Sequence, residues 1–291
     1  MKELTIVSGK GGTGKTSVVA SFAALAKNKV LADGDVDAAD LHLILAPDIK
    51  HEEDFRGGRV AKIDLEACTE CGECLDRCQF NAISPDFVVN KIDCEGCGVC
   101  VYFCPVEAID FPQVICGKWY ISETRLGPMV HAKLGIAEEN SGLLVSLVRN
   151  QAKVLAEDQG LDTIIVDGPP GIGCPVIASI TGTNVVLIVT EPTLSGLHDL
   201  ERVAGLAAHF KILTLACVNK FDINEEMSDR IATYCNNNQI ELVGRIPYDT
   251  TVTHAMVAGK SVVEFSDGKV ADAIKGLWRR VEDFLFDGTS G

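Results

Sequence analysis

Residues 9–17 read GKGGTGKTS and stand between an apolar run at residues 4–8 and a helical pattern at residues 15–27. A glycine-rich loop in this position lets backbone N–H groups surround phosphate oxygens at the positive end of a helix dipole. Lys15 is then placed to reach the outer phosphates, and the hydroxyl of Thr16 to coordinate Mg²⁺. The stretch therefore predicts a phosphate site formed by Gly9, Lys10, Gly11, Gly12, Thr13, Gly14, Lys15, Thr16 and Ser17.

Strand and helix patterns alternate along most of the remaining chain. Runs of Val, Ile and Leu predict strands at residues 29–33, 163–167, 184–189, 212–218 and 241–246. Helical patterns fall at residues 39–45, 143–157, 197–208, 225–237 and 269–286. Strands this apolar are buried on both faces, so we expect a doubly wound parallel α/β sheet of the P-loop type. This domain would comprise residues 1–46 and 118–291, interrupted by a smaller one at residues 59–112.

The interrupting segment contains the spacing C-x2-C-x2-C-x3-C twice, repeated at a period of 26 residues. This pattern is typical of two-cluster bacterial ferredoxins, in which the fourth cysteine of each run ligates the other cluster. Zinc is disfavoured, because tetrahedral zinc sites prefer paired C-x2-C hooks set apart. We therefore expect two 4Fe-4S clusters. The first would be held by Cys68, Cys71, Cys74 and Cys104, and the second by Cys94, Cys97, Cys100 and Cys78.

The overall composition restricts partners and location. The 291-residue chain has 26 basic and 41 acidic residues, a net charge of −15, which opposes binding to nucleic acid. The uncharged stretch at residues 168–190 is broken by prolines and glycines, so we expect a turn, a helix and a buried strand there, and no stable membrane insertion. The twelve cysteines and the lack of an apolar leader after Met1 favour a cytoplasmic, reducing location.

Lys10 adds a second lysine to the loop, in the form KGGxGK[ST]. With it the chain resembles the deviant-Walker-A ATPases, a family that includes MinD, ParA, the Mrp-type carriers and the nitrogenase iron protein. The resemblance implies that Lys10 reaches the phosphates of a facing subunit. Hydrolysis would then need an ATP-dependent dimer, formed with a second copy or with a related ATPase.

Further motifs follow in that family's order. The stretch ADGDVDAADL resembles its switch I, which implies that Asp35 orients the attacking water and Asp33 lies near Mg²⁺. IIVDGPPG resembles its Walker B and switch II, with Asp167 on the Mg²⁺ side. VNKFD and IPYD resemble its base-recognition segments, which implies Asn219, Pro247 and Asp249 around adenine. The catalytic residues would thus be Lys10, Lys15, Asp35 and Asp167.

These expectations combine into a Mg-dependent ATPase with an inserted ferredoxin domain, in which nucleotide state gates electron transfer to a protein partner. The insert leaves the main domain just after the switch I stretch, which is why we expect coupling. The alternative is an ATP-dependent carrier that assembles clusters for an apo-protein.

Four cysteines and one segment lie outside both cluster motifs. Cys174 is read either as a ligand or redox thiol or as a buried helix-start residue, while Cys116, Cys217 and Cys235 are expected to be structural. Residues 117–135 are read either as a surface hairpin or as a segment that carries switch motion to the insert.

Overall fold

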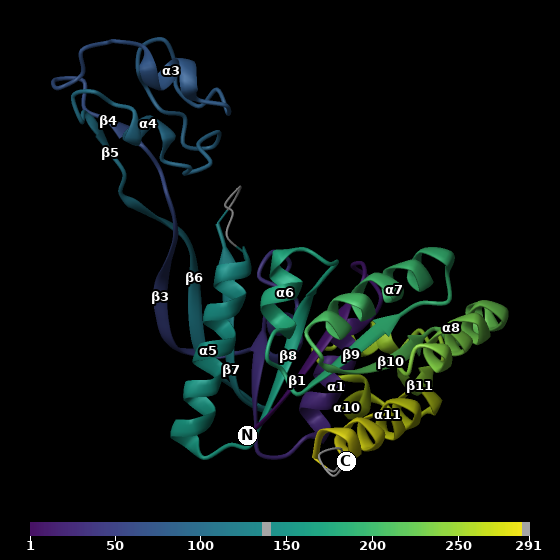
Figure 1. The fold of residues 1–291 in the computed structure, drawn as a ribbon. Helices are drawn as coiled ribbons and strands as arrows, with labels where there is room; N and C mark the ends of the chain where they lie inside the picture. Colours follow the sequence, from purple (N-terminus) through teal and green to yellow (C-terminus); the bar gives the residue numbers. More distant parts are fainter. Residues whose placement is uncertain (136–140, 287–291) are drawn as a thin grey trace. The chain divides into compact units, whose positions relative to one another are not determined.

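The computed structural model describes residues 1–135 and 141–286, which divide into two compact units (Figure 1). The main unit comprises residues 1–52, 119–133 and 141 onward, and the inserted unit comprises residues 53–118 with a short stretch that begins at residue 134. The boundaries expected at residues 46, 59, 112 and 118 lie in or beside two long strands, β3 (Asp48–Arg59) and β6 (Gln113–Thr124). These two strands run from one unit into the other.

The main sheet has nine strands in the order β11-β10-β9-β1-β8-β2-β7-β6-β3. Besides β3 and β6 it consists of β1 (Lys2–Ser8), β2 (Lys29–Asp33), β7 (Gly127–Leu134), β8 (Thr163–Pro170), β9 (Val185–Thr190), β10 (Leu213–Asn219) and β11 (Glu241–Ile246). All pairs from β11 to β7 are parallel, as expected. β6 and β7 are joined by two residues and so form an antiparallel hairpin, which makes the sheet mostly rather than wholly parallel.

Helices cover both faces of this sheet, because side chains along each strand alternate between two cores. Leu187 and Leu215 face one core, which is closed by α1 (Lys15–Leu25), α2 (Leu41–Leu45), α9 (Thr251–Val257), α10 (Val262–Phe265) and α11 (Lys269–Phe286). Val186 and Ala216 face the other, which is closed by α6 (Cys174–Ile180), α7 (Leu194–His209) and α8 (Glu225–Asn237). Helix α5 (Ser141–Gln159) packs on α6 and β2. The short 3-10 helix η1 (Phe221–Ile223) precedes α8.

Several sequence expectations are confirmed. Residues 168–190 form the end of β8, helix α6 and the buried strand β9. Helix α11 docks on the core through Trp278, whose ring centroid lies 4.9 Å from that of Phe22. Cys116, Cys217 and Cys235 are buried in β6, β10 and α8. Residues 117–135 do form a hairpin, but β7 pairs with β2 inside the main sheet, so the segment extends the sheet rather than lying on its surface.

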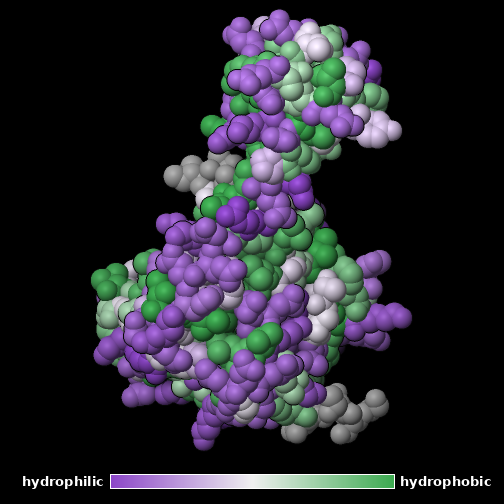
Figure 2. All heavy atoms as spheres, turned by 90° about the vertical axis from the view of Figure 1, so that its left-hand side faces the viewer, coloured by the Kyte–Doolittle hydropathy of each residue, from purple (hydrophilic) through white to green (hydrophobic). Residues whose placement is uncertain are grey.

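The inserted unit is small and built from short elements. It contains β4 (Lys62–Ile63) paired antiparallel with β5 (Ile109–Asp110), and the helices α3 (Glu73–Arg77) and α4 (Val99–Tyr102). Its buried apolar cluster consists of Ala61, Cys74, Ile83 and Ile109, with cysteines among the side chains packed around it. In Figure 2 its surface alternates between hydrophilic and hydrophobic side chains.

Candidate functional site

The phosphate loop joins β1 to α1, and its glycines are required by close neighbours. Gly14 has φ of 86°, a left-handed conformation, and a Cβ there would lie 2.3 Å from Nδ2 of Asn219. That amide instead donates a hydrogen bond of 2.7 Å to the carbonyl of Thr13. A Cβ at Gly9 would overlap Asp199 of α7. Neighbouring strands and helices thus hold the loop backbone in one shape.

Three carboxylates surround the buried end of Lys15. Its Nζ pairs with Oδ1 of Asp167 and lies 3.5 Å from Oδ2 of Asp35. Asp33 is fully buried opposite Asp167 in the parallel register of β2 and β8, and it accepts a hydrogen bond from the backbone N–H of Asp35. Parallel strands end at one edge of the sheet, which explains why residues distant in sequence meet here.

Burial and charge shift the protonation of this group. The pKa of Asp33 is raised well above its ordinary value, first by burial and then by the charge of Asp167. Burial also raises the pKa of Asp35 to about 6, against the opposing pull of Lys15. Burial would lower the pKa of Lys15, but Asp167 and Asp35 outweigh it and the pKa is raised. Lys15 therefore keeps its positive charge. This single charge does not balance three carboxylates.

The donor set fits Mg²⁺. Oδ2 of Asp33, Oδ2 of Asp167 and Oγ1 of Thr13 are buried without a hydrogen-bond partner. Unsatisfied buried oxygens are costly, and a bound cation or phosphate would give these oxygens partners. Mg²⁺ in nucleotide sites takes one or two carboxylates and completes its shell with phosphate oxygens and water. Asp33 and Asp167 would hold it together with Thr16, the second residue of α1.

The remaining sequence candidates lie near β10 and β11. Asn219 contacts the phosphate loop, as described above. Pro247 and Asp249 lie in the connection between β11 and α9, where Asp249 accepts a hydrogen bond of 2.8 Å from the backbone N–H of Thr251, the first residue of α9. Their roles at adenine stay a prediction.

Glu191, at the end of β9, is a residue that the sequence reasoning missed. Its carboxylate lies 3.3 Å from Nζ of Lys10 and 2.6 Å from Nζ of Lys220, and the same Nζ of Lys220 approaches the carbonyl of Gly12 at 3.4 Å. Burial would raise the pKa of Glu191, but the two lysines lower it. The available signal was its position directly after a buried strand, where a parallel sheet presents ligand groups.

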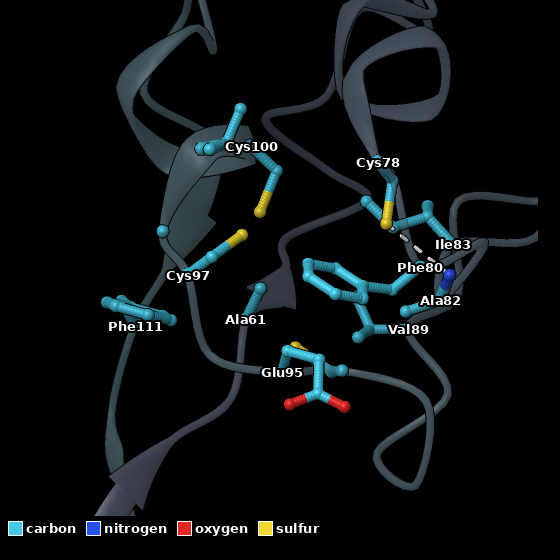
Figure 3. Close-up of a pocket in the computed structure, with 13 residues that line it drawn as sticks. Ala61, Cys78, Phe80, Ala82, Ile83, Val89, Glu95, Cys97, Cys100 and Phe111 are labelled. Atoms are coloured by element: carbon cyan, nitrogen blue, oxygen red, sulfur yellow. Dashed lines mark hydrogen bonds between the residues drawn. The ribbon is translucent and has the colours of Figure 1, made fainter.

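In the inserted unit, eight cysteines line two hollows. One, containing about 370 Å³ of empty space with its open mouth included, is lined by Cys78, Cys94, Cys97 and Cys100. Figure 3 shows the sulfur atoms of Cys97 and Cys100 pointing into it, with Phe80 and Phe111 among its walls. The other, of about 290 Å³, is lined by Cys68, Cys71, Cys74 and Cys104. Each hollow thus combines three cysteines of one run with the fourth of the other.

Four cysteines line each hollow, and four is the number of thiolates that a 4Fe-4S group takes, one on each iron. Among residues 1–135 and 141–286, no three His, Cys, Asp or Glu side chains form a group that could hold one metal ion. Backbone N–H groups of Ala82 and Ala108 donate to the sulfurs of Cys78 and Cys104 at 3.4 and 3.3 Å, the kind of contact that tunes such clusters.

Cys174 lines neither hollow and is exposed at the start of α6 in the main unit. Its backbone and Cβ pack closely against Gly142 of α5. This rules out the expectation of a buried helix-start cysteine, and a ligand role stays a prediction. Within the described part of the chain, no helix is long and apolar enough to cross a membrane.

A glycine-rich loop at the carboxyl edge of a mostly parallel sheet, with buried carboxylates around its lysine, defines a P-loop nucleotide-binding protein. The family model of the CobQ/CobB/MinD/ParA nucleotide binding domain (CbiA) matches residues 4–262, and the chain belongs to this family.

Relatives cover either the whole chain or a short part of it. The uncharacterized protein MJ0578 of Methanocaldococcus jannaschii is 33% identical over 287 residues, which is 97% of each chain. A ferredoxin of Chlorobaculum thiosulfatiphilum is 42% identical over 53 residues, 15% of this chain and 87% of the ferredoxin. The pyruvate synthase subunit PorD of Methanothermobacter marburgensis is 34% identical over 47 residues, 16% of this chain and 58% of that subunit.

Solved structures share the fold. The septum site-determining protein MinD of Pyrococcus horikoshii, complexed with Mg-ADP, aligns with a TM-score of 0.60 at 18% identity, covering 100% of this chain and 99% of that one. Cobyrinic acid a,c-diamide synthase of Mycobacterium smegmatis, with a bound ATP analogue and magnesium, aligns with a TM-score of 0.52 at 16% identity, covering 99% and 97%.

Proposed function

We propose that the protein is a Mg-dependent ATPase whose inserted unit carries two 4Fe-4S clusters, and that the bound nucleotide controls electron transfer from these clusters to a protein partner. The observation that carries this proposal is the pair of hollows, each lined by three cysteines of one run and the fourth of the other. Eight thiols arranged in this way match the two ligand sets of a two-cluster ferredoxin. The short likeness to a ferredoxin supports the same reading.

The ATPase part of the proposal assigns roles to the phosphate-loop residues. Lys15 neutralises the outer phosphates, Asp35 orients the attacking water, and Thr16, Asp33 and Asp167 hold Mg²⁺. Phosphoryl transfer needs little covalent chemistry from the protein beyond positioning and charge stabilisation, which these groups supply. Lys10, at the mouth of the loop, acts across the interface of an ATP-dependent dimer formed with a second copy or a related ATPase. The thiolate ligands favour a reducing, cytoplasmic compartment.

Coupling is proposed from the way in which the two units are connected. β3 begins 13 residues after Asp35, beyond the short helix α2, and continues into the inserted unit, while β6 returns to the main sheet. Movement of the Asp33–Asp35 segment on hydrolysis therefore acts on one of the two strands that carry the clusters. When bound, the clusters supply one-electron redox chemistry, and the protein contributes their thiolates, their N–H donors and their link to the nucleotide.

Cluster carriage is the second candidate, favoured by one observation. Cys71 and Cys97, one in each ligand set, are exposed, which would give an apo-protein access to a cluster. Transfer of both clusters to an apo-ferredoxin, at a rate that depends on ATP, would support carriage over electron transfer.

The test begins with anaerobic reconstitution, which should give about eight iron atoms per chain. Replacing Cys97 with Ser should lower the iron content, whereas Cys235→Ser, at a buried cysteine far from both hollows in sequence, should not.

Midpoint potentials are then measured by EPR-monitored titration without nucleotide, with Mg-ADP and with a nonhydrolysable ATP analogue. We expect a shift of some tens of millivolts that is lost in Lys15→Met, since 59 mV per electron corresponds to about 1.4 kcal/mol. Identical potentials in all three states would contradict gating.

A further inference from the structure

The two halves of the inserted unit can be compared position by position, because they repeat at a period of 26 residues. The repeat holds in the backbone as well as in the cysteines. Gly72 and Gly98 both precede a short helix with φ of 80° and 73°, and Asn81 and Glu107 both adopt φ near 50°. Each half therefore serves as an internal control for what the fold itself requires of the other.

The halves differ where their helices face solvent. In α3 the outward positions are Glu73, Asp76 and Arg77, all exposed and all charged. The positions 26 residues later in and after α4 are Val99, Tyr102 and Phe103, whose exposed fractions are 37%, 84% and 42%. The inward positions Leu75 and Val101 are apolar in both halves and partly buried. Since the same fold carries charges at these positions in α3, packing does not require the apolar side chains of α4.

These three side chains, which we call the α4 face, lie beside the ligands of both hollows. Val99 lines the larger hollow together with Cys100. In the sequence, Tyr102 and Phe103 lie between Cys100, which lines that hollow, and Cys104, which lines the other. The two rings form an edge-to-face pair with centroids 5.0 Å apart. Exposed aromatic side chains of this kind are enriched at the centres of protein interfaces.

The negative charge of the inserted unit determines which kind of protein can bind at the α4 face. Residues 59–112 carry ten acidic and four basic side chains, so a second copy presenting its own inserted unit would be repelled. The nearest cation, Arg77, lies 4.0 Å from the centroid of the Phe103 ring and is neutralised by Glu73 at 2.8 Å. An apolar centre within an acidic surround is complementary to a protein with an apolar notch inside a basic rim.

We propose that the α4 face is the docking surface for an electron-carrying protein that has an apolar hollow surrounded by basic residues. The proposal rests on the cluster function proposed above, because it is the neighbouring hollows that make this surface useful to such a partner.

The test exchanges the two aromatic residues for their counterparts in α3. Tyr102→Asp with Phe103→Arg leaves the net charge unchanged and uses residue types that the repeat already accommodates. Ile92→Ser is the control, because it removes another apolar side chain, 75% exposed, from a loop of the same unit. Tyr102→Asp alone is a second variant that changes only the most exposed ring.

Cytochrome c, a basic haem protein that accepts one electron, serves as the probe. Its affinity for each variant is measured by calorimetry in the oxidised state, and its reduction rate is measured with chemically reduced protein. We expect the double variant to lower both by about tenfold, while iron content and reduction of a small uncharged acceptor stay as in the wild type. Ile92→Ser should match the wild type in every measurement.

The outcomes separate this proposal from the cluster function. Equal affinity in the wild type and the double variant, or no affinity of the wild type for the probe, would overturn the docking surface. Protein that binds no iron yet loses calorimetric affinity in the double variant would uphold the surface and remove the cluster function.

Discussion

Glu191 shares its carboxylate between Lys10 and Lys220 beside the phosphate loop. The lysine expected to act on a facing subunit thus pairs with a carboxylate of its own chain. A phosphate bound at the loop competes with Glu191 for these lysines. The phosphate is also repelled by the negative charge of the Glu191 carboxylate. Glu191 therefore opposes the ATP-bound arrangement.

We expect Glu191→Gln to bind ATP about fivefold more tightly, a gain of about 1 kcal/mol, because it removes that charge and frees both lysines. Self-association in the presence of ATP should rise with it. The affinity is measured by calorimetry with Mg and a nonhydrolysable analogue. Glu201→Gln removes the same charge from an exposed position of α7 and should leave the affinity unchanged. Weaker binding by Glu191→Gln would show instead that the carboxylate holds Lys10 in its working position.

The sequence predicts the phosphate site well and its surroundings less well. The resemblance of their motifs to those of the deviant-Walker-A ATPases implies one site for Lys15, Asp33, Asp35 and Asp167, and the parallel strands bring them to one edge of the sheet. Glu191 obeys the same rule, but its pairing with Lys10 is a side-chain contact across β9 and the loop that no spacing specifies. The contact of Asn219 with Thr13 is missed for the same reason.

At the level of elements, the β6–β7 hairpin shows which strand pairings cannot be predicted from the local sequence pattern. The turn between its strands was visible in the sequence, whereas its pairing with β2 was not, because that pairing joins segments about 100 residues apart. Arg125 in the turn then reaches across the main unit, donating to the carbonyl of Ile44 and pairing with Glu264. Glu264 also accepts from the backbone N–H of Ser261 and so completes the capping box of α10.

This contact predicts a pH-dependent contribution to stability. Burial would raise the pKa of Glu264, but Arg125 and Ser261 outweigh it and lower the pKa from 4.5 to about 2. A carboxyl group with a lowered pKa in the folded state stabilises the protein above its unfolded value of 4.5, and this stabilisation is lost as the pH falls toward 2. Because Arg125 and Glu264 are partly exposed, the contribution is about 1 kcal/mol, to which the lost cap adds a similar amount.

We therefore expect Glu264→Gln to lower the free energy of unfolding of the main unit by about 1–2 kcal/mol at pH 7. The difference from the wild type should shrink between pH 4.5 and pH 3. Urea unfolding across this range measures it, with Glu201→Gln as a surface control. A difference that stays constant with pH would mean that the ionised carboxylate is not what Arg125 stabilises.

At the scale of the whole molecule, the two units differ in how they are held together. The main unit has extensive apolar cores on both faces of its sheet. Among the described residues of the inserted unit, the buried apolar cluster has four members, one of which is the motif residue Cys74, and further motif cysteines pack around it. A segment of this size rarely buries enough apolar surface to fold alone, and metal binding commonly supplies the missing free energy. The cysteine spacing predicts two clusters for this unit from the sequence alone.

The two units should therefore unfold separately and respond to different ligands. In anaerobic calorimetry of the loaded protein we expect two transitions. Removing iron with a chelator should abolish the transition of the inserted unit. The midpoint temperature of the main unit should stay within a few degrees of its value in the loaded protein, since the cores are separate.

A nonhydrolysable ATP analogue with Mg²⁺ should raise the midpoint temperature of the main unit by several degrees, and Lys15→Met should cancel this rise. A coupling of about 1–2 kcal/mol would move the other transition far less than iron removal does. A single transition that shifts with both ligands would show instead that the strands β3 and β6 join the units into one cooperative body, and the nucleotide would then act on the clusters through shared stability rather than through a switch.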